Sequence, residues 1–316
     1  MRISLMIGIG GGDASSPVDR YVEDLRAARD DGFGRVWSSQ LPWDPDLLTI
    51  LAVAVHEVDR IRVGTAVLPI QVRHPTVMAQ QALTVNLVAG GRLALGLGLA
   101  HRPVSEEMWG IAWDRPVRRL REYLDGLLPL LHGEEADVRG EIVSTRGRLR
   151  IPGAPPPPVY VAALGPQMLR LAGRRTEGTI TWMTGPRTIA DHIGPTLRGA
   201  AGEVGREVEV LSGLPVCVTD DVAAARALAA EQFAMYGTLP SYRAMLDREG
   251  WPEPADATLI GDEDTVAGQL EKLREAGVDE FLGMPFGRSA EEKARTRAFL
   301  LTQHQDQRRA APQPQC

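Results

Sequence analysis

The fold is decided by residues 159–186, which have the sequence VYVAALGPQMLRLAGRRTEGTITWMTGP. Val159 to Ala163 is a short apolar run with β-branched residues, which predicts a strand. Gly165 then turns the chain, and Pro166 stands at the first position of a helix, where its missing N–H costs nothing. Thr179 to Met183 begins the next strand. The segment therefore predicts one strand–helix–strand unit of an α/β fold.

The start of this helix is a candidate phosphate-binding site. The N–H groups of Gln167 and Met168 have no partner in a helix that begins at Pro166, so they would point out along the helix axis. Together with the helix dipole they form a seat for an anion. An ordinary strand-to-helix turn without a ligand is the alternative, because a single Gly-Pro turn is a weak motif.

The same alternation of strand and helix extends over the rest of the chain. Apolar runs that predict strands occupy residues 3–9, 35–39, 61–68, 92–98, 159–163, 179–183, 214–218 and 280–284. Helical patterns occupy residues 18–31, 45–58, 74–87, 116–131, 189–201, 222–236, 265–276 and 291–301. Near-continuous apolar strands are typical of a parallel sheet that is buried on both faces. The pattern predicts a (β/α)8 barrel, with a doubly wound sheet as the alternative, although no GxGxxG motif follows the first strand.

We expect a single barrel domain over residues 1–302. Two insertions interrupt the alternation. Residues 133–158, after the fourth strand, are polar and then proline-rich, and residues 237–259, near the seventh strand, are expected to lie over the barrel mouth. The polar tail, residues 303–316, is expected to be disordered.

Composition narrows the class of protein. The chain has 316 residues and a net charge of −6, without a basic stripe for nucleic acid or a polybasic patch for a membrane surface. Its two cysteines, Cys217 and Cys316, support neither a disulfide framework nor a zinc site, and no metal site is expected. The apolar run at the N-terminus is too short for a signal peptide. We therefore expect a soluble, cytoplasmic protein.

In such a barrel the active site is built by the loops that follow the C-terminal ends of the strands. This rule selects residues 8–12, 38–43, 65–73, 98–102, 163–166, 183–186 and 284–288. Several of these loops are rich in glycine, which lets the backbone approach a flat ligand closely.

Four runs at these positions resemble a known family. They are VGTAVLPIQVRHPTVMAQQALTVN, GGRLALGLGLAHRP, VYVAALGPQMLRLAG with EGTITWM, and LIGDEDTVAGQLEKLREAGVDEFL. In this order they resemble the bacterial luciferase-like superfamily, and within it the actinobacterial oxidoreductases that use coenzyme F420, a deazaflavin hydride carrier. The resemblance covers about residues 1–300.

The resemblance implies a cofactor held at the C-terminal ends of the strands. It implies a non-prolyl cis peptide at Gly64–Thr65, against which the deazaflavin ring rests, and a phosphate of the cofactor tail on the turn at residues 163–166. The residues expected to contact the cofactor are Ser39, Gln40, Gly64, Thr65, Gly96, Gly98, Ala162, Ala163, Leu164, Gly165, Pro166, Met168, Met183 and Thr184. For Gly96 and Gly98 close packing inside the barrel is the alternative role, and for Thr65 it is filling a strand.

The candidate proton donor is His101, which stands just past the fourth strand where some relatives carry a glutamate. Hydride delivery to a double bond leaves an anion that must be protonated, and an imidazole has a pKa suited to that work. The second strand ends in Ser39-Gln40 where some relatives carry an Asp-His pair, so one familiar acid is missing. Trp43 and Arg288 are expected to contact the substrate. For His101 a loop position that caps backbone is the alternative.

The resemblance thus predicts an F420-dependent oxidoreductase that moves a hydride between the deazaflavin C5 and a C=C, C=N or C=O bond of a small molecule. The alternatives are an FMN-dependent monooxygenase and a non-catalytic deazaflavin-binding protein. A sugar phosphate is not the expected substrate, because the lysines that such relatives use are absent and only Lys272 and Lys293 exist. A homodimer is expected from the same resemblance.

Overall fold

The computed structural model describes residues 1–9 and 16–310, with side chains described up to residue 305. Eight parallel strands form a closed ring in which β9 pairs with β10 and β12 pairs with β1. They are β1 (Arg2–Met6), β2 (Arg35–Ser38), β3 (Arg62–Thr65), β5 (Leu93–Gly98), β8 (Val159–Ala162), β9 (Gly178–Trp182), β10 (Glu209–Val218) and β12 (Glu280–Pro285). Two short strands, β4 (Leu68–Pro69) and β11 (Leu259–Gly261), extend the ring beside β5 and β10. The closure confirms the predicted (β/α)8 barrel and excludes the doubly wound sheet.

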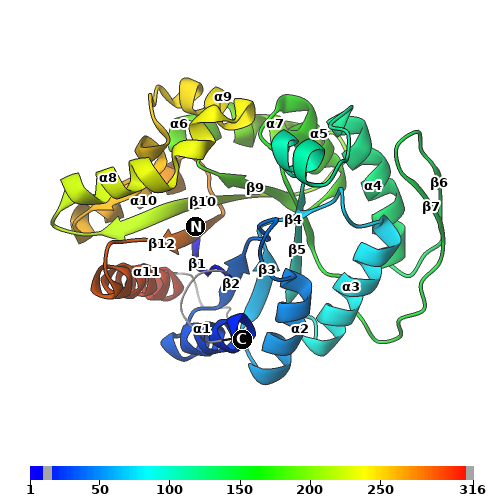
Figure 1. Cartoon of the computed structure of the whole chain (residues 1–316), viewed down its shortest axis with the longest axis horizontal. Helices are drawn as coiled ribbons and strands as arrows, with labels where there is room; N and C mark the ends of the chain where they lie inside the picture. The colour runs from blue at the N-terminus through cyan, green and yellow to red at the C-terminus, as the bar shows by residue number, and fades with distance from the viewer. Residues whose placement is uncertain (10–15, 311–316) are drawn as a thin grey trace.

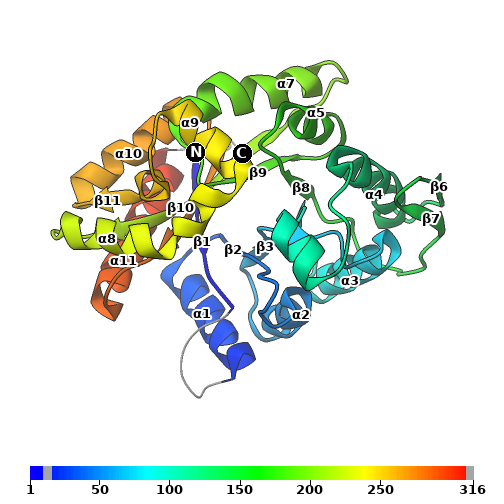
Figure 2. The ribbon, with the colours of Figure 1, turned by 45° about the horizontal axis from the view of Figure 1, so that its top comes forward.

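Helices surround the strands on the outside (Figures 1 and 2). They are α1 (Pro17–Asp31), α2 (Leu47–Glu57), α3 (Pro75–Val88), α4 (Pro116–Leu131), α5 (Pro166–Arg175), α6 (Pro186–Thr188), α7 (Gly194–Gly202), α8 (Val222–Gln232), α9 (Pro240–Glu249), α10 (Glu263–Glu275) and α11 (Ala290–Ala310). Capping residues explain several boundaries: the Asp46 and Asp262 side chains accept N–H groups of the first turns of α2 and α10. None of the described helices is both long enough and apolar enough to cross a membrane.

The C-terminal helix is longer than expected. It continues to Ala310, so residues 303–310 are helical where the sequence predicts a disordered tail. The polar composition is compatible with a helix here because α11 packs against β1, β10 and β12 earlier in its length and is simply extended from there. Residues 311–316 lie outside the described residues.

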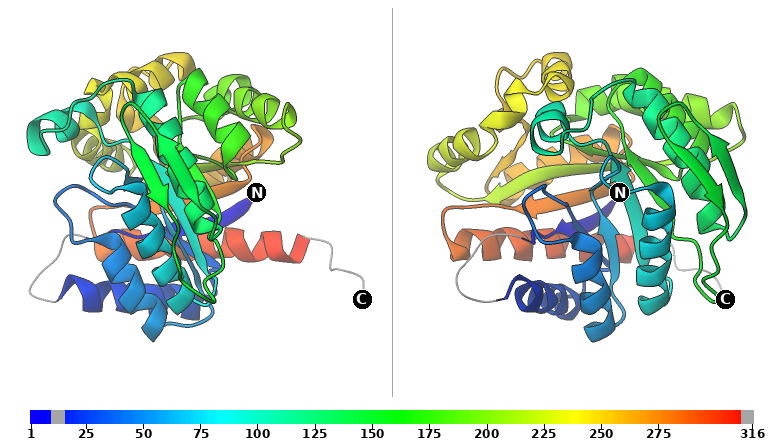
Figure 3. Two further views of the ribbon diagram at one scale, coloured as in Figure 1. Left: turned by 90° about the vertical axis from the view of Figure 1, so that its right-hand side faces the viewer. Right: turned by 45° about the vertical axis from the view of Figure 1, so that its right-hand side comes forward.

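The two insertions occupy different sides of the barrel. In the first, β6 (Ala136–Arg139) and β7 (Ser144–Gly147) form an antiparallel hairpin on the outside, next to α4 (Figure 3). The carboxylate of Glu122 on α4 holds its turn by accepting N–H groups of Glu141, Ile142 and Val143. The second consists of η3 (Ala234–Thr238), α9 and η4 (Pro254–Ala257). It contacts Trp182 at the end of β9 and packs against α6 and α8.

A charged network fills the lower end of the barrel, where the strands begin. The Glu280 carboxylate is buried and accepts hydrogen bonds from Trp37 Nε1 and Ser4 Oγ, each at 2.7 Å. Its other oxygen pairs with Arg35 at 2.9 Å and Arg2 at 3.0 Å. Burial alone would raise the pKa of Glu280, but the Arg35 charge and these hydrogen bonds outweigh it and lower the pKa. This end of the barrel is therefore closed, and a ligand must enter from the opposite end.

Candidate active site

Small residues form the upper layer of the barrel interior. A Cβ added to Gly98 would lie 2.6 Å from Val67 Cγ2 and 3.2 Å from Ala162 Cβ, and one added to Gly96 would lie 1.9 Å from the Thr65 carbonyl oxygen. Both glycines are thus required for close packing of β5 against its neighbours. Because β5 and β8 end in such small residues, no large side chain stands between a flat ligand and the backbone at these strand ends.

The cis peptide bond joins Ala66 and Val67, so the expected position at Gly64–Thr65 is wrong by two residues. Gly64 has a different role, because a Cβ there would lie 2.3 Å from the Trp37 ring. The Thr65 hydroxyl donates to the Gly96 carbonyl and accepts the Gly96 N–H, each at 2.8 Å. Its proton therefore links two strands, and the expected hydrogen bond from this hydroxyl to the cofactor ring has no donor left.

The turn between β8 and α5 fits a phosphate. Gly165 is the N-cap of α5 without a side-chain cap, and no atom outside Gly165 and its two chain neighbours lies within 4 Å of the place where its Cβ would stand. Leu169 N donates to Gly165 O, so the N–H groups of Gln167 and Met168 precede the hydrogen bonds of the helix. The open space before these N–H groups is the expected anion seat.

Neighbouring side chains hold this turn in place. The Thr179 hydroxyl lies within hydrogen-bond distance of Ala163 N at 3.2 Å, and His192 Nε2 lies 2.8 Å from the Leu164 carbonyl oxygen. Ala163 is buried, whereas Gly165 and Pro166 are exposed. The turn is therefore braced from beneath and open above, as a preformed binding site requires.

The end of β2 differs from the prediction in one residue. Ser39 is half-buried, and its hydroxyl makes no hydrogen bond to another described residue. The Gln40 amide donates to the carbonyls of Leu41 and Pro45 and accepts the Leu47 N–H, so it shapes the approach to α2 and is not free for a cofactor. Trp43, in the same loop, is 65% exposed.

His101 lies at the mouth, as predicted. It follows β5, and the preceding residue, Ala100, is fixed by Gln71, whose amide bonds both the N–H and the carbonyl of Ala100. The imidazole is half-buried, and its ring centroid lies 5.6 Å from that of Tyr242 in an edge-to-face contact. Burial lowers the pKa of His101 below its ordinary value of 6.5. The imidazole is therefore mainly neutral at pH 7.

A chain of aromatic rings continues from His101 across the mouth. Tyr242 on α9 lies 5.0 Å from Tyr236 on η3, and Tyr236 lies 6.1 Å from Trp182 at the end of β9, measured between ring centroids. None of these three aromatic residues is among those predicted from the sequence. The insertion at 237–259 is a signal for Tyr242 alone, and which of its side chains face the barrel depends on how α9 docks.

Met183 and Thr184 follow β9 and are both buried. Met183 has φ = 52°, a left-handed conformation that is rare for a bulky residue and is often found at functional sites. The Thr184 hydroxyl donates to the Trp182 carbonyl at 3.1 Å. Both residues are fully enclosed by the protein, and Met183 packs in the hydrophobic cluster next to the aromatic chain, so their contact with a cofactor stays a prediction.

Arg288 is not free to bind a substrate anion. Its guanidinium pairs with Asp221 at 2.8 Å and with Glu292 at 2.7 Å. The bond from Arg288 lowers the pKa of Glu292 to about 2, so both partners are charged near neutral pH. The predicted loop at residues 8–12 can be compared only in part, because residues 10–15 lie outside the described residues.

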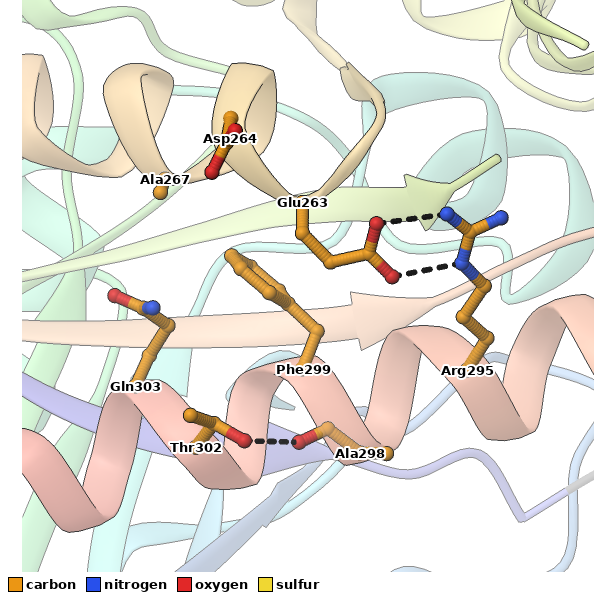
Figure 4. A pocket seen from close by; sticks show the side chains of 8 residues that line it. All are labelled: Glu263, Asp264, Ala267, Arg295, Ala298, Phe299, Thr302 and Gln303. Atoms are coloured by element: carbon orange, nitrogen blue, oxygen red, sulfur yellow. Dashed lines mark hydrogen bonds and ion pairs between the residues drawn. The ribbon is translucent and has the colours of Figure 1, made fainter. Parts of the chain in front are cut away.

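A separate groove of about 380 Å³ lies on the outer wall between α10 and α11. Figure 4 shows Phe299 at its centre and the paired side chains of Glu263 and Arg295 on one side. It lies between helices and contains none of the predicted site residues. The strand ends, not this groove, bring the candidate residues together.

Known proteins resemble this chain over most of its length. The family described as luciferase-like monooxygenase matches residues 1–280. The F420-dependent glucose-6-phosphate dehydrogenase of Nakamurella multipartita is 30% identical over 253 residues, which cover 75% of this chain and 73% of that protein.

Two solved structures share the fold at 20% identity. The coenzyme F420-dependent tetrahydromethanopterin reductase of Methanopyrus kandleri has a TM-score of 0.78, covering 95% of this chain and 96% of that one. The monooxygenase RslO1 of Streptomyces bottropensis has a TM-score of 0.79, covering 98% and 100%.

Proposed function

The chain belongs to the luciferase-like monooxygenase family, and we propose that it is an F420-dependent oxidoreductase acting on a small organic molecule. The observation that carries the proposal is the turn at Gly165, where unpaired N–H groups face open space beside a floor of small residues. The name of the relative from Nakamurella multipartita supports F420 as the cofactor. An FMN-dependent monooxygenase is the second candidate, because a monooxygenase shares the fold.

Different residues at the barrel mouth would bind different parts of the cofactor. The N–H groups of Gln167 and Met168 would hold the phosphate of the cofactor, and the helix dipole of α5 adds to their attraction. The ring would lie above the end of β5, where Gly98 packs against Val67 and Ala162, and the Ser39 hydroxyl is available for its polar edge. The deazaflavin supplies hydride chemistry at its C5, while the protein supplies orientation and exclusion of water.

His101 is the proposed proton-transfer residue. A lowered pKa leaves its imidazole neutral near pH 7, ready to accept a proton when the substrate is oxidised. In the reductive direction the protonated imidazole must donate, and its population rises as the pH falls. The two directions are therefore expected to have opposite pH dependence.

We also propose that the protein is a homodimer. Large apolar side chains are exposed on α2 and α3: Val53, Val77, Leu87 and Val88 are each at least 40% exposed. A second copy packed against these two neighbouring helices would cover the exposed apolar side chains. Size-exclusion chromatography with light scattering tests this part by itself, and a monomer at micromolar concentration would contradict it.

The cofactor assignment is tested by titrating the purified protein with F420 and, separately, with FMN, followed by fluorescence quenching. Micromolar binding of F420 with negligible binding of FMN is the expected result. Preference for FMN would support the monooxygenase and make oxygen uptake the next assay. Binding of neither cofactor would refute both.

A further inference from the structure

The chain of aromatic rings at the barrel mouth suits a substrate that itself contains a planar ring. Tyr236 and Tyr242 are half-buried and pack at the edge of a buried hydrophobic cluster, so neither residue is fully enclosed. They stand between His101 and Trp182, which come from the ends of two different strands. Aromatic side chains prefer edge-to-face or offset contacts with another ring. A planar substrate ring would find such partners directly beside the candidate proton donor.

Arginines at the strand ends are already paired with carboxylates. Each of the four that follow β4, β5, β9 and β12 lies beside a carboxylate of this chain. The pairs are Arg73–Asp46, Arg102–Glu106, Arg187–Asp191, and Arg288 with both Asp221 and Glu292. An anionic substrate would have to compete with these carboxylates for the arginines. The charges on this face therefore favour an uncharged substrate over a phosphate or a carboxylate.

The segment that carries the two tyrosines is fixed to the barrel. Glu249, at the end of α9, accepts the N–H groups of Arg187 and Thr188 at 3.0 and 2.7 Å, and so caps the start of α6. A Cβ added to Gly185 would lie 2.3 Å from the Trp251 ring, which shows how closely the end of this segment is packed. A wall fixed in this way can bind a ligand without the cost of ordering a loop.

We propose that Tyr236 and Tyr242 determine substrate specificity by selecting uncharged molecules whose reducible bond is conjugated to an aromatic ring, such as aryl enones. This inference rests on the proposed function. In the reduction of such an enone, the C=C bond gains a hydride from reduced F420 at its β-carbon and a proton at its α-carbon. The bond becomes single, and the enone takes up the two electrons that the coenzyme loses.

Two pairs of compounds test the proposal. Calorimetry measures binding of the saturated ketones 4-phenylbutan-2-one and pentan-2-one, which report the pocket without turnover. Steady-state kinetics with reduced F420 compares 4-phenylbut-3-en-2-one with pent-3-en-2-one. In the first pair we expect the aryl ketone to have a dissociation constant about tenfold or more lower than that of the aliphatic ketone. In the second pair we expect the aryl enone to have a KM lower by about the same factor. An aliphatic ketone that binds as tightly as its aryl partner would overturn the proposal.

Variants assign the preference to the two tyrosines. Tyr236→Leu and Tyr242→Leu are each expected to weaken binding of 4-phenylbutan-2-one about tenfold and binding of pentan-2-one less than twofold. Tyr242→Phe keeps the ring and should stay within threefold of the wild type. Met235→Ala changes a 48% exposed neighbour in η3 and serves as the matched control, with no expected effect. An unchanged aryl preference in both leucine variants, with folding confirmed by circular dichroism, would refute the assignment.

The design separates this inference from the proposed function. Binding of F420 is expected to be the same in all four variants, because the phosphate turn lies on α5 and not on the η3–α9 segment. If the wild type binds no F420, the proposed function fails and the inference about a reducible substrate fails with it. If F420 binds but no aryl preference is found, only the inference fails.

Discussion

Replacing Gly165 by valine separates folding from cofactor binding. Gly165 has φ = −79° and ψ = 151°, which is extended backbone that a β-branched residue adopts readily. No atom outside Gly165 and its two chain neighbours lies within 4 Å of its added Cβ. Glycine at an N-cap is worth only about 1 kcal/mol more than an apolar residue. The free energy of unfolding is therefore expected to change by no more than about 1 kcal/mol.

The same side chain should damage the anion seat. Its two methyl groups would occupy the open space in front of the N–H groups of Gln167 and Met168. A hydrogen bond to a charged group contributes about 1.5–3 kcal/mol, so losing one corresponds to a loss of affinity of about 10- to 100-fold. A fluorescence titration with F420 measures this loss, and a thermal melt checks the fold. Gly268→Ala on α10, at another position where an added Cβ meets no atom, is the control.

Two results would refute this reasoning. A folded Gly165→Val protein whose affinity for F420 stays within twofold of the wild type would show that the phosphate is held elsewhere. A melting temperature that collapses in this variant, but not in Gly268→Ala, would show that the space around Gly165 is not open.

Other predictions concern the two ends of the barrel. His101→Ala is expected to lower turnover about 100-fold or more, with F420 affinity within a few-fold, and unchanged turnover would reject the proton-transfer role. In the wild type the rate of substrate reduction should rise as the pH falls through the lowered pKa of His101, and the rate of substrate oxidation should fall. Rates that change with pH in the same way in both directions would contradict the proton-transfer role of His101. Glu280→Gln should destabilise the protein by about 3–5 kcal/mol, because it leaves the guanidinium groups of Arg35 and Arg2 without their buried partner. Denaturant unfolding measures this loss of stability. The Glu209 side chain is 33% exposed, so Glu209→Gln should lower the free energy of unfolding much less. The Glu280 contribution should be complete above pH 4.5, the ordinary value for glutamate, and be lost as the pH falls through its lower native pKa.

Strand order and barrel closure follow from the sequence because they depend on repeated local patterns. Each β-branched run followed by an amphipathic helix predicts one unit of the barrel, and the units can be connected in only a few ways. The end of α11 could not be predicted in this manner. Its last residues are polar, and they remain helical as a continuation of residues that pack against β1 and β10.

The candidate site is less predictable, because its roles depend on which polar groups find partners in three dimensions. Gln40 and Thr65 carry residue types suited to ligand contact, yet both direct their hydrogen bonds to backbone groups. Arg288 meets Asp221, which is distant in the sequence, and loses its availability for a substrate. In contrast, the start of α5 at Gly165 has the geometry that the sequence predicts, because a helix start leaves N–H groups unpaired whatever surrounds it. Local backbone geometry is therefore easier to predict from the sequence than the partners of polar side chains.

The interior of the barrel separates stability from function along its axis. At the lower end Glu280 and its arginine partners close the ring with charge, and at the upper end Gly96 and Gly98 pack closely against small and apolar neighbours. A change at Glu280 should thus lower the free energy of unfolding without altering F420 affinity. A change at Gly165 should lower F420 affinity and leave the free energy of unfolding nearly unchanged. Because the floor at the mouth is small and apolar, selectivity must come from the elements above it. Those elements are the His101 loop and the η3–α9 segment, whose rings meet at His101 and Tyr242. The contact joins the proposed proton-transfer residue to the proposed substrate wall, so an aryl substrate held by that wall would be placed beside the group that protonates it.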